Sequence, residues 1–371
     1  MKVIVLGAGL IGKTIAKDLS KKFEVTCADA NQSNLNELSS TPVKRLKFDF
    51  TNEMELKLNI QSFDLVIGAV PGFMGYQVLK HIIEAGKNVV DISFFPENPL
   101  SLDALAKKNG VTAVVDCGVA PGLCNIIAGH HDADEKLSFY ECLVGGLPAV
   151  RQWPYEYKAV FSPADVIEEY TRPARYVENG VLVTREALSD AEYVDFENVG
   201  TLESFNTDGL RTMADTMPHI KNMKEKTLRY PGHIELMRVL RETGFFDKNE
   251  IEINGTKISP LAFTSKLLFP KWKLKKGEVD VTIMRVTVKN NKAKYVYTLE
   301  DKADTATETT SMARTTAFTC TAAANLLLEG KYNRKGICPP EFVGADSNAF
   351  NEVINYLKER NVNLKKEVIT N

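Results

Sequence analysis

A glycine-rich loop near the amino terminus has the residue types and spacing that bind a dinucleotide phosphate. Gly7, Gly9 and Gly12 directly follow a short apolar run. In such a loop the first glycine permits a tight turn, the second lets the backbone approach a pyrophosphate, and the third lets helix and strand pack closely. We therefore expect the loop, with Leu10 and Ile11, to bind a pyrophosphate on the free N–H groups of a helix N-terminus.

An aspartate at the end of the next apolar run bears on the choice of cofactor. Asp29 lies close to the spacing at which a carboxylate accepts hydrogen bonds from the adenosine ribose hydroxyls. Its charge would repel a 2′-phosphate, and no Arg or Lys follows it before Lys44. The sequence therefore favours NAD over NADP. The alternative is that Asp29 only caps a turn at the end of a strand.

Further cofactor contacts are expected where parallel strands end, because ligands of open α/β sheets bind at the carboxyl edge. Asp49 and Asp91 close the third and fifth apolar runs, and Val70 with Pro71 closes the fourth. These four residues complete the expected cofactor-binding set.

The elements that must position these residues alternate between strand and helix. Near-continuous apolar runs are typical of a parallel sheet covered on both faces. The expected strands are residues 1–6, 23–28, 43–48, 63–70, 87–92 and 111–116. The expected helices are residues 13–19, 34–38, 53–60, 76–85 and 100–109. Because right-handed crossovers leave few other topologies, this α/β pattern predicts a Rossmann fold, a doubly wound parallel sheet.

From about Leu137 the pattern changes to longer, more amphipathic strands, which predicts a second, α+β domain. The expected strands are residues 137–144, 180–184, 251–253, 279–289 and 292–299, the last two joined by a hairpin at Asn290-Asn291. The expected helices are residues 163–170, 209–216, 233–242, 311–329 and 348–360.

Composition narrows the class of protein. The chain has 371 residues, of which 44% are hydrophobic and 25% charged, with a net charge of −2. Two domains fit this length, and the balanced charge argues against a nucleic-acid partner. No apolar run reaches the roughly 18 residues of a membrane span, and a strand starts at once, which leaves no place for a signal peptide. We therefore expect a cytoplasmic protein without membrane contact.

The six cysteines are scattered and show no metal-site spacing, so no metal is expected. Most are expected to be buried apolar residues, although a reactive thiol at Cys117 or Cys124 is an alternative.

Three segments of the second domain carry polar residues suited to a substrate of a hydride-transfer enzyme. Arginine is the natural bidentate partner of a carboxylate, which makes Arg211 and Arg229 candidate anchors; the alternative is that they are surface arginines. Asn206 and Thr207 are expected to fix the head group of an amino acid.

Three further residues are candidate catalytic groups. Tyr157 and Lys158 would supply a donor and a proton acceptor, unless the tyrosine is a core residue beside an exposed lysine. His233 stands after a Pro-Gly turn at a helix start, and its alternative is a structural histidine.

Together these motifs resemble the saccharopine dehydrogenase-like oxidoreductases, and within them the lysine 6-dehydrogenases most closely. The matching segments span nearly the whole chain: Gly7–Gly12, Gly118–Gly122, Val144–Pro148, Tyr157–Lys158 with Phe161–Ser162, and Thr227–His233. The resemblance implies a Rossmann domain at 1–124, a substrate-binding and dimerisation domain at 125–309, and C-terminal helices at 310–371 that return to the Rossmann domain. It also adds Pro121, Gly122 and Tyr230 to the substrate-binding residues and implies a homodimer.

Three departures from the saccharopine-forming branch refine the expected substrate. That branch carries a carboxylate just before the Pro-Gly pair, a cysteine just before the Gly-Gly-Leu-Pro segment, and a tyrosine at a third position. Here these positions are Ala120, Val144 and Phe94. We therefore expect an NAD-dependent dehydrogenase of the ε-carbon of L-lysine or a close analogue. The alternatives are a saccharopine or carboxynorspermidine-type dehydrogenase and a non-catalytic NAD-binding sensor.

Overall fold

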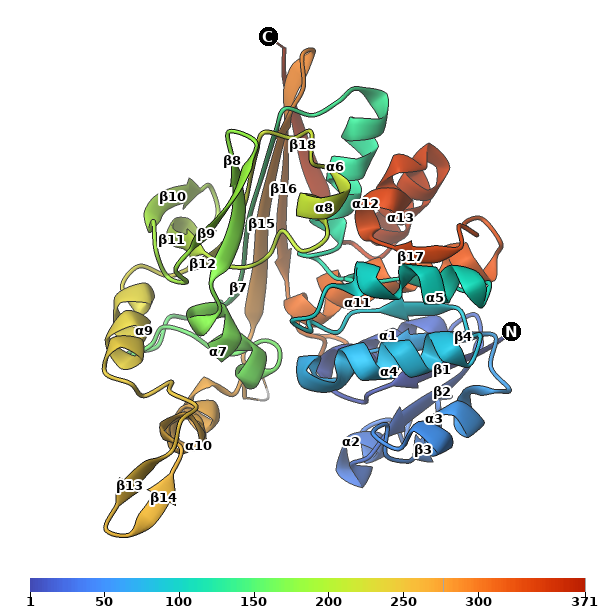
Figure 1. The fold of residues 1–371 in the computed structure, drawn as a ribbon, viewed down its shortest axis with the longest axis horizontal. Coiled ribbons are helices and arrows are strands. Elements are labelled where there is room, and N and C mark those ends of the chain that lie inside the picture. Colours follow the sequence, from blue (N-terminus) through green and yellow to red (C-terminus); the bar gives the residue numbers. More distant parts are fainter. Residues whose placement is uncertain (276, 371) are drawn as a thin grey trace. The chain divides into compact units, whose positions relative to one another are not determined.

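The structure is a computed structural model that describes residues 1–275 and 277–370 (Figure 1). Contacts within the chain divide it into two compact units. Unit 1 comprises Met1–Leu137, Arg211–Thr216 and Ala313–Asn363, and unit 2 comprises Ser138–Leu210, Met217–Met312 and Leu364–Asn371. The chain therefore passes between the units several times. The domain boundaries expected from the sequence stay a prediction.

Unit 1 contains a parallel sheet of seven strands in the order β17-β6-β5-β4-β1-β2-β3. The strands are β1 (Lys2–Leu6), β2 (Glu24–Asp29), β3 (Lys44–Lys47), β4 (Leu65–Gly68), β5 (Val89–Asp91), β6 (Thr112–Val114) and β17 (Gly336–Cys338). All residues of β4, β5 and β6 are buried, as their apolar runs predict. The predicted Rossmann fold is confirmed.

Helices complete unit 1. They are α1 (Leu10–Leu19), α2 (Gln32–Asn36), α3 (Glu53–Ile60), α4 (Gly72–Glu84), η1 (Pro99–Leu102), α5 (Asp103–Lys108), α6 (Leu123–Asp134), α8 (Met213–Thr216), α12 (Pro340–Ala345) and α13 (Ser347–Glu359), with α11 (Ser311–Leu328) from Ala313 onward. Among the described residues, no helix combines the length and hydrophobicity that crossing a bilayer requires.

The seventh strand was not expected from the sequence. β17 has only three residues, Gly336–Cys338, and pairs with β6 in parallel. A segment this short shows no period from which a strand can be recognised. The C-terminal segment thus contributes a strand as well as helices to unit 1.

Unit 2 contains a mixed sheet whose main path is β10-β11-β12-β7-β15-β16-β18, with β8 beside β12 and β9 beside β8. Its strands are β7 (Phe139–Pro148), β8 (Ala174–Glu178), β9 (Val181–Arg185), β10 (Glu192–Phe196), β11 (Gly200–Asn206), β12 (Asn222–Arg229), β15 (Asp280–Lys289), β16 (Ala293–Lys302) and β18 (Leu364–Thr370). Its helices are α7 (Pro163–Thr171), α9 (His233–Glu242) and α10 (Pro260–Trp272). The predicted second, α+β domain is confirmed, and its sheet is mixed.

A separate two-stranded hairpin, β13 (Ile251–Ile253) with β14 (Thr256–Ile258), leads into α10. One face of α7, α9 and α10 buries an aromatic cluster that includes Tyr157, Tyr170 and Trp272. This cluster surrounds several of the predicted site residues.

Candidate functional site

The glycine loop joins β1 to α1 in unit 1. Gly7 has a φ of +108°, and a Cβ at Gly12 would lie 2.0 Å from the carbonyl oxygen of Gly7. A Cβ at Gly9, in contrast, would meet nothing within 4 Å. Gly9 is also the N-cap of α1 and has no side-chain cap, so the first N–H groups of the helix have no side-chain acceptor there. The loop therefore offers both the space and the donors that a pyrophosphate requires.

Asp29 lies at the end of β2, next to this loop. Its Oδ2 accepts a hydrogen bond from the backbone N–H of Ala8 at 2.8 Å, and its Oδ1 accepts one from that of Asn31 at 2.7 Å. These bonds hold the carboxylate beside the glycine loop. The strand register also pairs Asp29 with Lys47 of β3. The sequence did not indicate that Lys47 lies beside Asp29, because the two residues become neighbours only through sheet pairing.

The other expected cofactor residues follow strands of the same sheet. Asp49 is exposed, and its Oδ1 accepts hydrogen bonds from the backbone N–H and hydroxyl of Thr51; these bonds lower its pKa. Val70 is buried, and the exposed Pro71 is the N-cap of α4. Asp91 ends β5 and is fully buried. All four lie at or just after the carboxyl ends of parallel strands.

Asp91 belongs to a buried ionic group that the sequence did not reveal. Its Oδ1 accepts from the N–H of Ser93 at 2.8 Å, and its Oδ2 accepts from the hydroxyl of Ser93 at 3.3 Å. Burial, reinforced by the charge of Asp116, raises the pKa of Asp91 to about 8, although Ser93 and Arg211 act in the opposite direction. Asp91 therefore keeps its proton at neutral pH.

Arg211 is buried in unit 1. Its Nε donates to both carboxylate oxygens of Asp116, at 3.1 and 3.2 Å, and its Nη1 donates to the carbonyl of Phe95 at 2.7 Å. The guanidinium also lies 5.0 Å from the ring centroid of Phe94. Both Arg211 and Asp116 have a φ of 51°, in the left-handed region. A substrate carboxylate would have to compete with Asp116 for this guanidinium.

The segment before α6 contains two expected substrate residues. Gly122 is the N-cap of α6 and its N–H donates to Oδ1 of Asn125, while Pro121 is half-buried. The cysteines considered as reactive, Cys117 and Cys124, are fully buried. Burial raises the pKa of the Cys117 thiol well above its usual value, so this thiol is not activated as a nucleophile.

Unit 2 brings its three substrate-related segments together in one sheet. Large parts of these segments lie in the neighbouring strands β7, β12 and β11. Register pairs Glu203 with Arg229 across β11 and β12, and Val144 with Thr227 across β7 and β12. Val144 lies in the expected strand 137–144, whereas no strand was expected at Glu203, Thr227 or Arg229.

Arg229 is buried at the end of β12 and has several internal partners. Its Nη2 donates to Glu169 at 2.6 Å and its Nε donates to the hydroxyl of Tyr170 at 3.2 Å. Its Cζ lies 4.6 Å from the ring centroid of Tyr157. Burial raises the pKa of the Tyr157 hydroxyl well above its usual value, even though Arg229 lowers it. Tyr157 therefore stays protonated at neutral pH.

His233 is held in one tautomer by two neighbours. Its Nδ1 lies 2.7 Å from the carbonyl oxygen of Tyr155, which only accepts, so Nδ1 carries the hydrogen. Nε2 then accepts from the hydroxyl of Tyr170 at 2.9 Å. Burial and the nearby charge of Arg229 lower the pKa of His233 to about 3. Both ring nitrogens are engaged, and the imidazole is neutral at physiological pH.

The remaining predicted residues of unit 2 also have partners within the unit. Lys158 donates to the carbonyl of Lys271 at 3.1 Å. The Asn206 amide accepts from Tyr176 and donates to Ser189 at 2.9 Å and Asp190 at 2.8 Å. The Thr207 and Thr227 hydroxyls are 3.0 Å apart, and Tyr230 donates to the carbonyl of Pro148 at 3.0 Å. Tyr157, His233 and Arg229 therefore form one cluster. Lys158, Asn206, Thr207 and Tyr230 have other partners.

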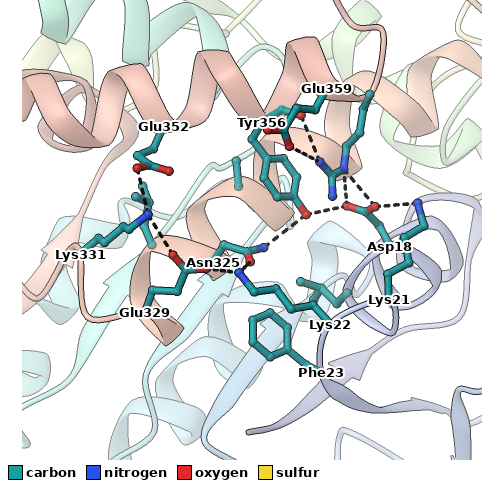
Figure 2. Close-up of a pocket in the computed structure, with 14 residues that line it drawn as sticks. Asp18, Lys21, Lys22, Phe23, Asn325, Glu329, Lys331, Glu352, Tyr356 and Glu359 are labelled. Carbon is teal, nitrogen blue, oxygen red and sulfur yellow. Dashed lines mark hydrogen bonds and ion pairs between the residues drawn. The ribbon is translucent and has the colours of Figure 1, made fainter.

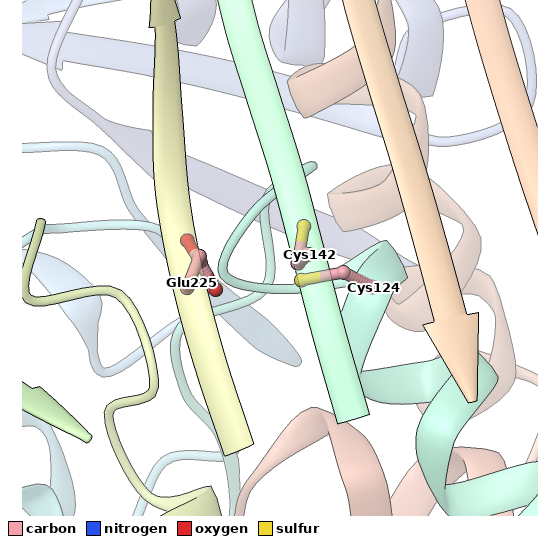
Figure 3. Close-up of side chains that lie close together, drawn as sticks. All are labelled: Cys124, Cys142 and Glu225. Atoms are coloured by element: carbon pink, nitrogen blue, oxygen red, sulfur yellow. The ribbon is translucent and has the colours of Figure 1, made fainter. Parts of the chain in front are cut away.

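Two groups of potential metal-binding side chains bear on the expectation that no metal binds. On the outside of unit 1, Glu53, His81 and Glu84 lie within reach of one another. The ammonium of Lys57 lies 2.6 Å from Glu53 and 2.7 Å from Glu84, so a cation already occupies this acidic group. In unit 2, Cys142 of β7 and Glu225 of β12 are register partners, and both are buried (Figure 3).

Unit 1 also has a charged pocket of about 320 Å³, between α1, α11 and α13 (Figure 2). Asp18 lines this pocket and is buried. Its carboxylate accepts from Arg360 at 2.9 Å, from Tyr356 at 2.8 Å and from Thr321 at 2.9 Å. Burial raises the pKa of Asp18, but the bonds and charge of Arg360 outweigh it, and the net pKa is lowered. Hydrogen bonds beside this pocket thus connect the end of α13 to α1, the helix that follows the glycine loop.

Comparisons with known proteins agree with this geometry. A family model described as "Saccharopine dehydrogenase NADP binding domain" matches residues 3–114, and one described as "Saccharopine dehydrogenase C-terminal domain" matches residues 118–362. The apo saccharopine dehydrogenase (L-Glu forming) of Saccharomyces cerevisiae has the same fold, with a TM-score of 0.80 over 99% of both chains at 19% identity.

Curated relatives are distant and differ in length. Carboxyaminopropylagmatine dehydrogenase of Synechocystis sp. is 22% identical over 93% of both proteins. Saccharopine dehydrogenase [NADP(+), L-glutamate-forming] of Pyricularia oryzae is 26% identical over 67% of this chain, which spans 58% of that relative. The match to the alpha-aminoadipic semialdehyde synthase of Arabidopsis thaliana spans 23% of that longer protein.

The matched domains, the dinucleotide-type glycine loop and the two-unit fold lead to one assignment. The resemblance expected from the sequence is confirmed at the level of the family, and so is the expected class of enzyme. The chain belongs to the saccharopine dehydrogenase family and is an oxidoreductase.

Proposed function

We propose that this chain is an NAD-dependent amine dehydrogenase that oxidises the ε-carbon of L-lysine or a close analogue. The observation that carries the cofactor choice is the carboxylate of Asp29, which is held beside the glycine loop by the N–H of Ala8. There it would accept hydrogen bonds from the ribose hydroxyls and repel a 2′-phosphate. Lys47 is the competing observation, because a lysine beside Asp29 favours the phosphate of NADP.

Local polarity supports a simple amine as the substrate. Phe94, Ala120 and Val144 present apolar side chains at positions where the saccharopine-forming branch carries polar ones, and a second carboxylate-bearing arm would need polar partners. The amine must be neutral to release a hydride, since an ammonium has no lone pair, and its usual pKa is about 10.4. Apolar surroundings lower that pKa by desolvation.

The reaction balances as a two-electron oxidation. The carbon–hydrogen bond at the ε-carbon breaks, NAD accepts the hydride when it is bound, and the amine becomes an imine with loss of one proton. Water then converts the imine to an aldehyde and ammonia, or the imine cyclises.

Each of the three catalytic residues expected from the sequence either keeps its own proton or is hydrogen-bonded within unit 2. Tyr157 keeps its own proton, and His233 has both ring nitrogens engaged. Lys158 donates to a backbone carbonyl. Asp91, at the carboxyl end of β5, also keeps its proton at neutral pH, because its pKa is about 8.

A second candidate function is oxidation of a carboxyalkyl amine. The specific observation in its favour is the Synechocystis relative, a carboxyaminopropylagmatine dehydrogenase that matches over 93% of both proteins. In that case the bond that is oxidised joins carbon to a secondary nitrogen, and hydrolysis releases an amine in place of ammonia.

Formation of NADH from a panel of amines tests the proposal. The panel contains L-lysine, saccharopine and a carboxyalkyl polyamine, each with NAD and with NADP. Deuterium at the ε-carbon of lysine should slow the reaction and appear in the NADH, whereas deuterium at the α-carbon should do neither. Oxidation of only a carboxyalkyl substrate would favour the second candidate. Binding of NADH without oxidation of any amine would favour a sensor.

A further inference from the structure

The charged pocket of unit 1, between α1, α11 and α13, lies apart from the residues of the candidate site (Figure 2). Each described residue that lines it belongs to unit 1, and these residues include neither the glycine loop nor any predicted site residue. Its volume of about 320 Å³ falls in the range of roughly 300–1,000 Å³ that small-molecule sites occupy. The pocket is therefore large enough to hold a small ligand.

A row of four side chains with alternating charge lines part of this pocket. The row runs from Lys22 through Glu329 and Lys331 to Glu352, as the dashed contacts in Figure 2 show. Lys22 forms an ion pair with Glu329. The ammonium of Lys331 lies 3.0 Å from a carboxylate oxygen of Glu329 and 2.9 Å from one of Glu352. Each inner member of the row thus contacts two groups of opposite sign.

The four side chains are charged at neutral pH and can be reached from solvent. Hydrogen bonds from Lys22 and Lys331 lower the pKa of Glu329, and hydrogen bonds to Glu352 and Glu329 raise the pKa of Lys331. The side chains of the row are between 27% and 57% exposed. Ion pairs at this exposure add little to the stability of a fold. Stability is therefore a poor explanation for the row.

The balance of charge in the pocket indicates the class of ligand. Four cationic and four anionic side chains line it: Lys21, Lys22, Lys331 and Arg360, and Asp18, Glu329, Glu352 and Glu359. A ligand with a single charge would meet a group of its own sign beside every partner in the row. A zwitterion whose two charges lie close together can instead place each charge beside the opposite sign.

We propose that this pocket binds a free α-amino acid, as a second ligand site separate from the site of the oxidised amine. The carboxylate of the ligand would lie between the ammonium groups of Lys22 and Lys331. Its own ammonium would lie between the carboxylates of Glu329 and Glu352. This placement keeps the alternation of sign and adds charge-assisted hydrogen bonds at both ends of the head group.

The rest of the pocket offers room for a short side chain. The buried Leu19 and Leu326 line it together with Phe23, and they give an apolar surface beside the charged row. The carboxylate of Asp18 already accepts hydrogen bonds from Arg360 and Tyr356. The row of four side chains, and not Asp18, therefore recognises the head group.

A nuclear magnetic resonance titration of the full chain without NAD tests the site, with L-alanine as the probe. We expect saturable shifts of the amide signals of residues 21–23 and 329–331. Propionate and ethylammonium each carry only one of the two charges of alanine, and they should bind at least about tenfold more weakly. Equal binding of alanine and of either analogue would overturn the proposal.

A pair of double variants shows whether the row itself holds the ligand. Lys331→Met with Glu352→Gln removes one partner from each charge of the ligand and should weaken alanine binding by about tenfold or more. The control, Lys44→Met with Glu24→Gln, removes an exposed ion pair outside the pocket and should bind alanine like wild type. Circular dichroism should show equal folding of both variants, since the altered side chains are exposed.

The outcomes are separate from those for the proposed function. Alanine that causes no saturable shift in wild type, or that binds the Lys331→Met, Glu352→Gln variant as tightly as wild type, would overturn the amino-acid site. The same variant should form NADH from its substrate at the wild-type rate, because the row lies outside the candidate site. Absence of NADH formation from every amine would contradict the proposed function and leave the alanine titration unaffected.

Discussion

Replacing Asp91 with asparagine should remove a specific pH dependence from the stability of the protein. In the unfolded chain this carboxyl group titrates at its usual 3.8, whereas in the folded chain it titrates at about 8. Between these values the folded state binds one proton more than the unfolded state. The free energy of unfolding of wild type therefore falls as the pH rises through this window. Asparagine has no proton to lose, so the variant lacks this contribution.

The magnitude follows from the two titration points. A difference of one pKa unit corresponds to about 1.4 kcal/mol, so the separation between 3.8 and about 8 sets an upper limit of about 6 kcal/mol. The substitution is nearly isosteric, which matters because a Cβ at Gly68 would lie only 1.8 Å from Oδ2 of Asp91. We expect the free energy of unfolding of the variant, relative to that of wild type, to increase by roughly 1 kcal/mol per pH unit between about pH 5 and 8.

Urea denaturation of both proteins at several pH values measures the effect. The difference between the two unfolding free energies cancels the titration of all other groups that the substitution leaves unchanged. Infrared difference spectra give an independent check, since the carbonyl band of a protonated carboxyl should be present in wild type and absent in Asp91→Asn. Parallel stability curves would refute the assignment of a retained proton to Asp91.

Three further substitutions test other parts of the molecule. Arg229→Met should destabilise the fold by about 3–5 kcal/mol in urea, because the half-buried Glu169 loses its cation. Glu169→Gln should recover most of that loss, and a cost of the single variant below about 1 kcal/mol would contradict this. Asp18→Asn should have a pH dependence opposite to that of Asp91→Asn, because the folded pKa of Asp18 is lowered. The stability that the Asp18 carboxylate contributes to wild type is therefore complete at neutral pH and is lost as the pH falls below 3.8. Thermal unfolding of both proteins at several pH values would show this. Asp29→Asn should weaken NADH binding by about tenfold or more in fluorescence titrations, and it should reduce the ratio of the affinity for NADH to the affinity for NADPH. The control Asp49→Asn, at an exposed position, should have a smaller effect on both quantities.

The nucleotide-binding unit could be predicted well from the sequence because its information is local. Six strands and the glycine loop follow from apolar runs and from the glycine spacing. Asp29 was found in the same way. Lys47, in contrast, became its neighbour only through the pairing of β2 with β3. Register between strands is set by tertiary packing, which no single run of sequence records.

The second unit shows the same limit for the candidate site. The helix His233–Glu242 was predicted with its observed bounds, and the β15–β16 hairpin was found from its turn. Strand β12 was missed because its polar residues and its Pro-Gly turn are typical of a loop. Once β12 is a central strand, Arg229 is buried, and its partner Glu169 comes from a helix 60 residues away. Such pairs cannot be recognised from spacing.

The discontinuous make-up of unit 1 has a consequence for its biosynthesis. After residue 114 has been translated, β6 has a sheet partner on one side only, because β17 lies more than 220 residues downstream. The whole of the unit 2 segment Met217–Met312 emerges from the ribosome in between. During that interval the nascent chain presents an unpaired strand edge, which is where wrong pairing and aggregation start. We therefore expect β6 to be a site at which a chaperone protects this protein during translation.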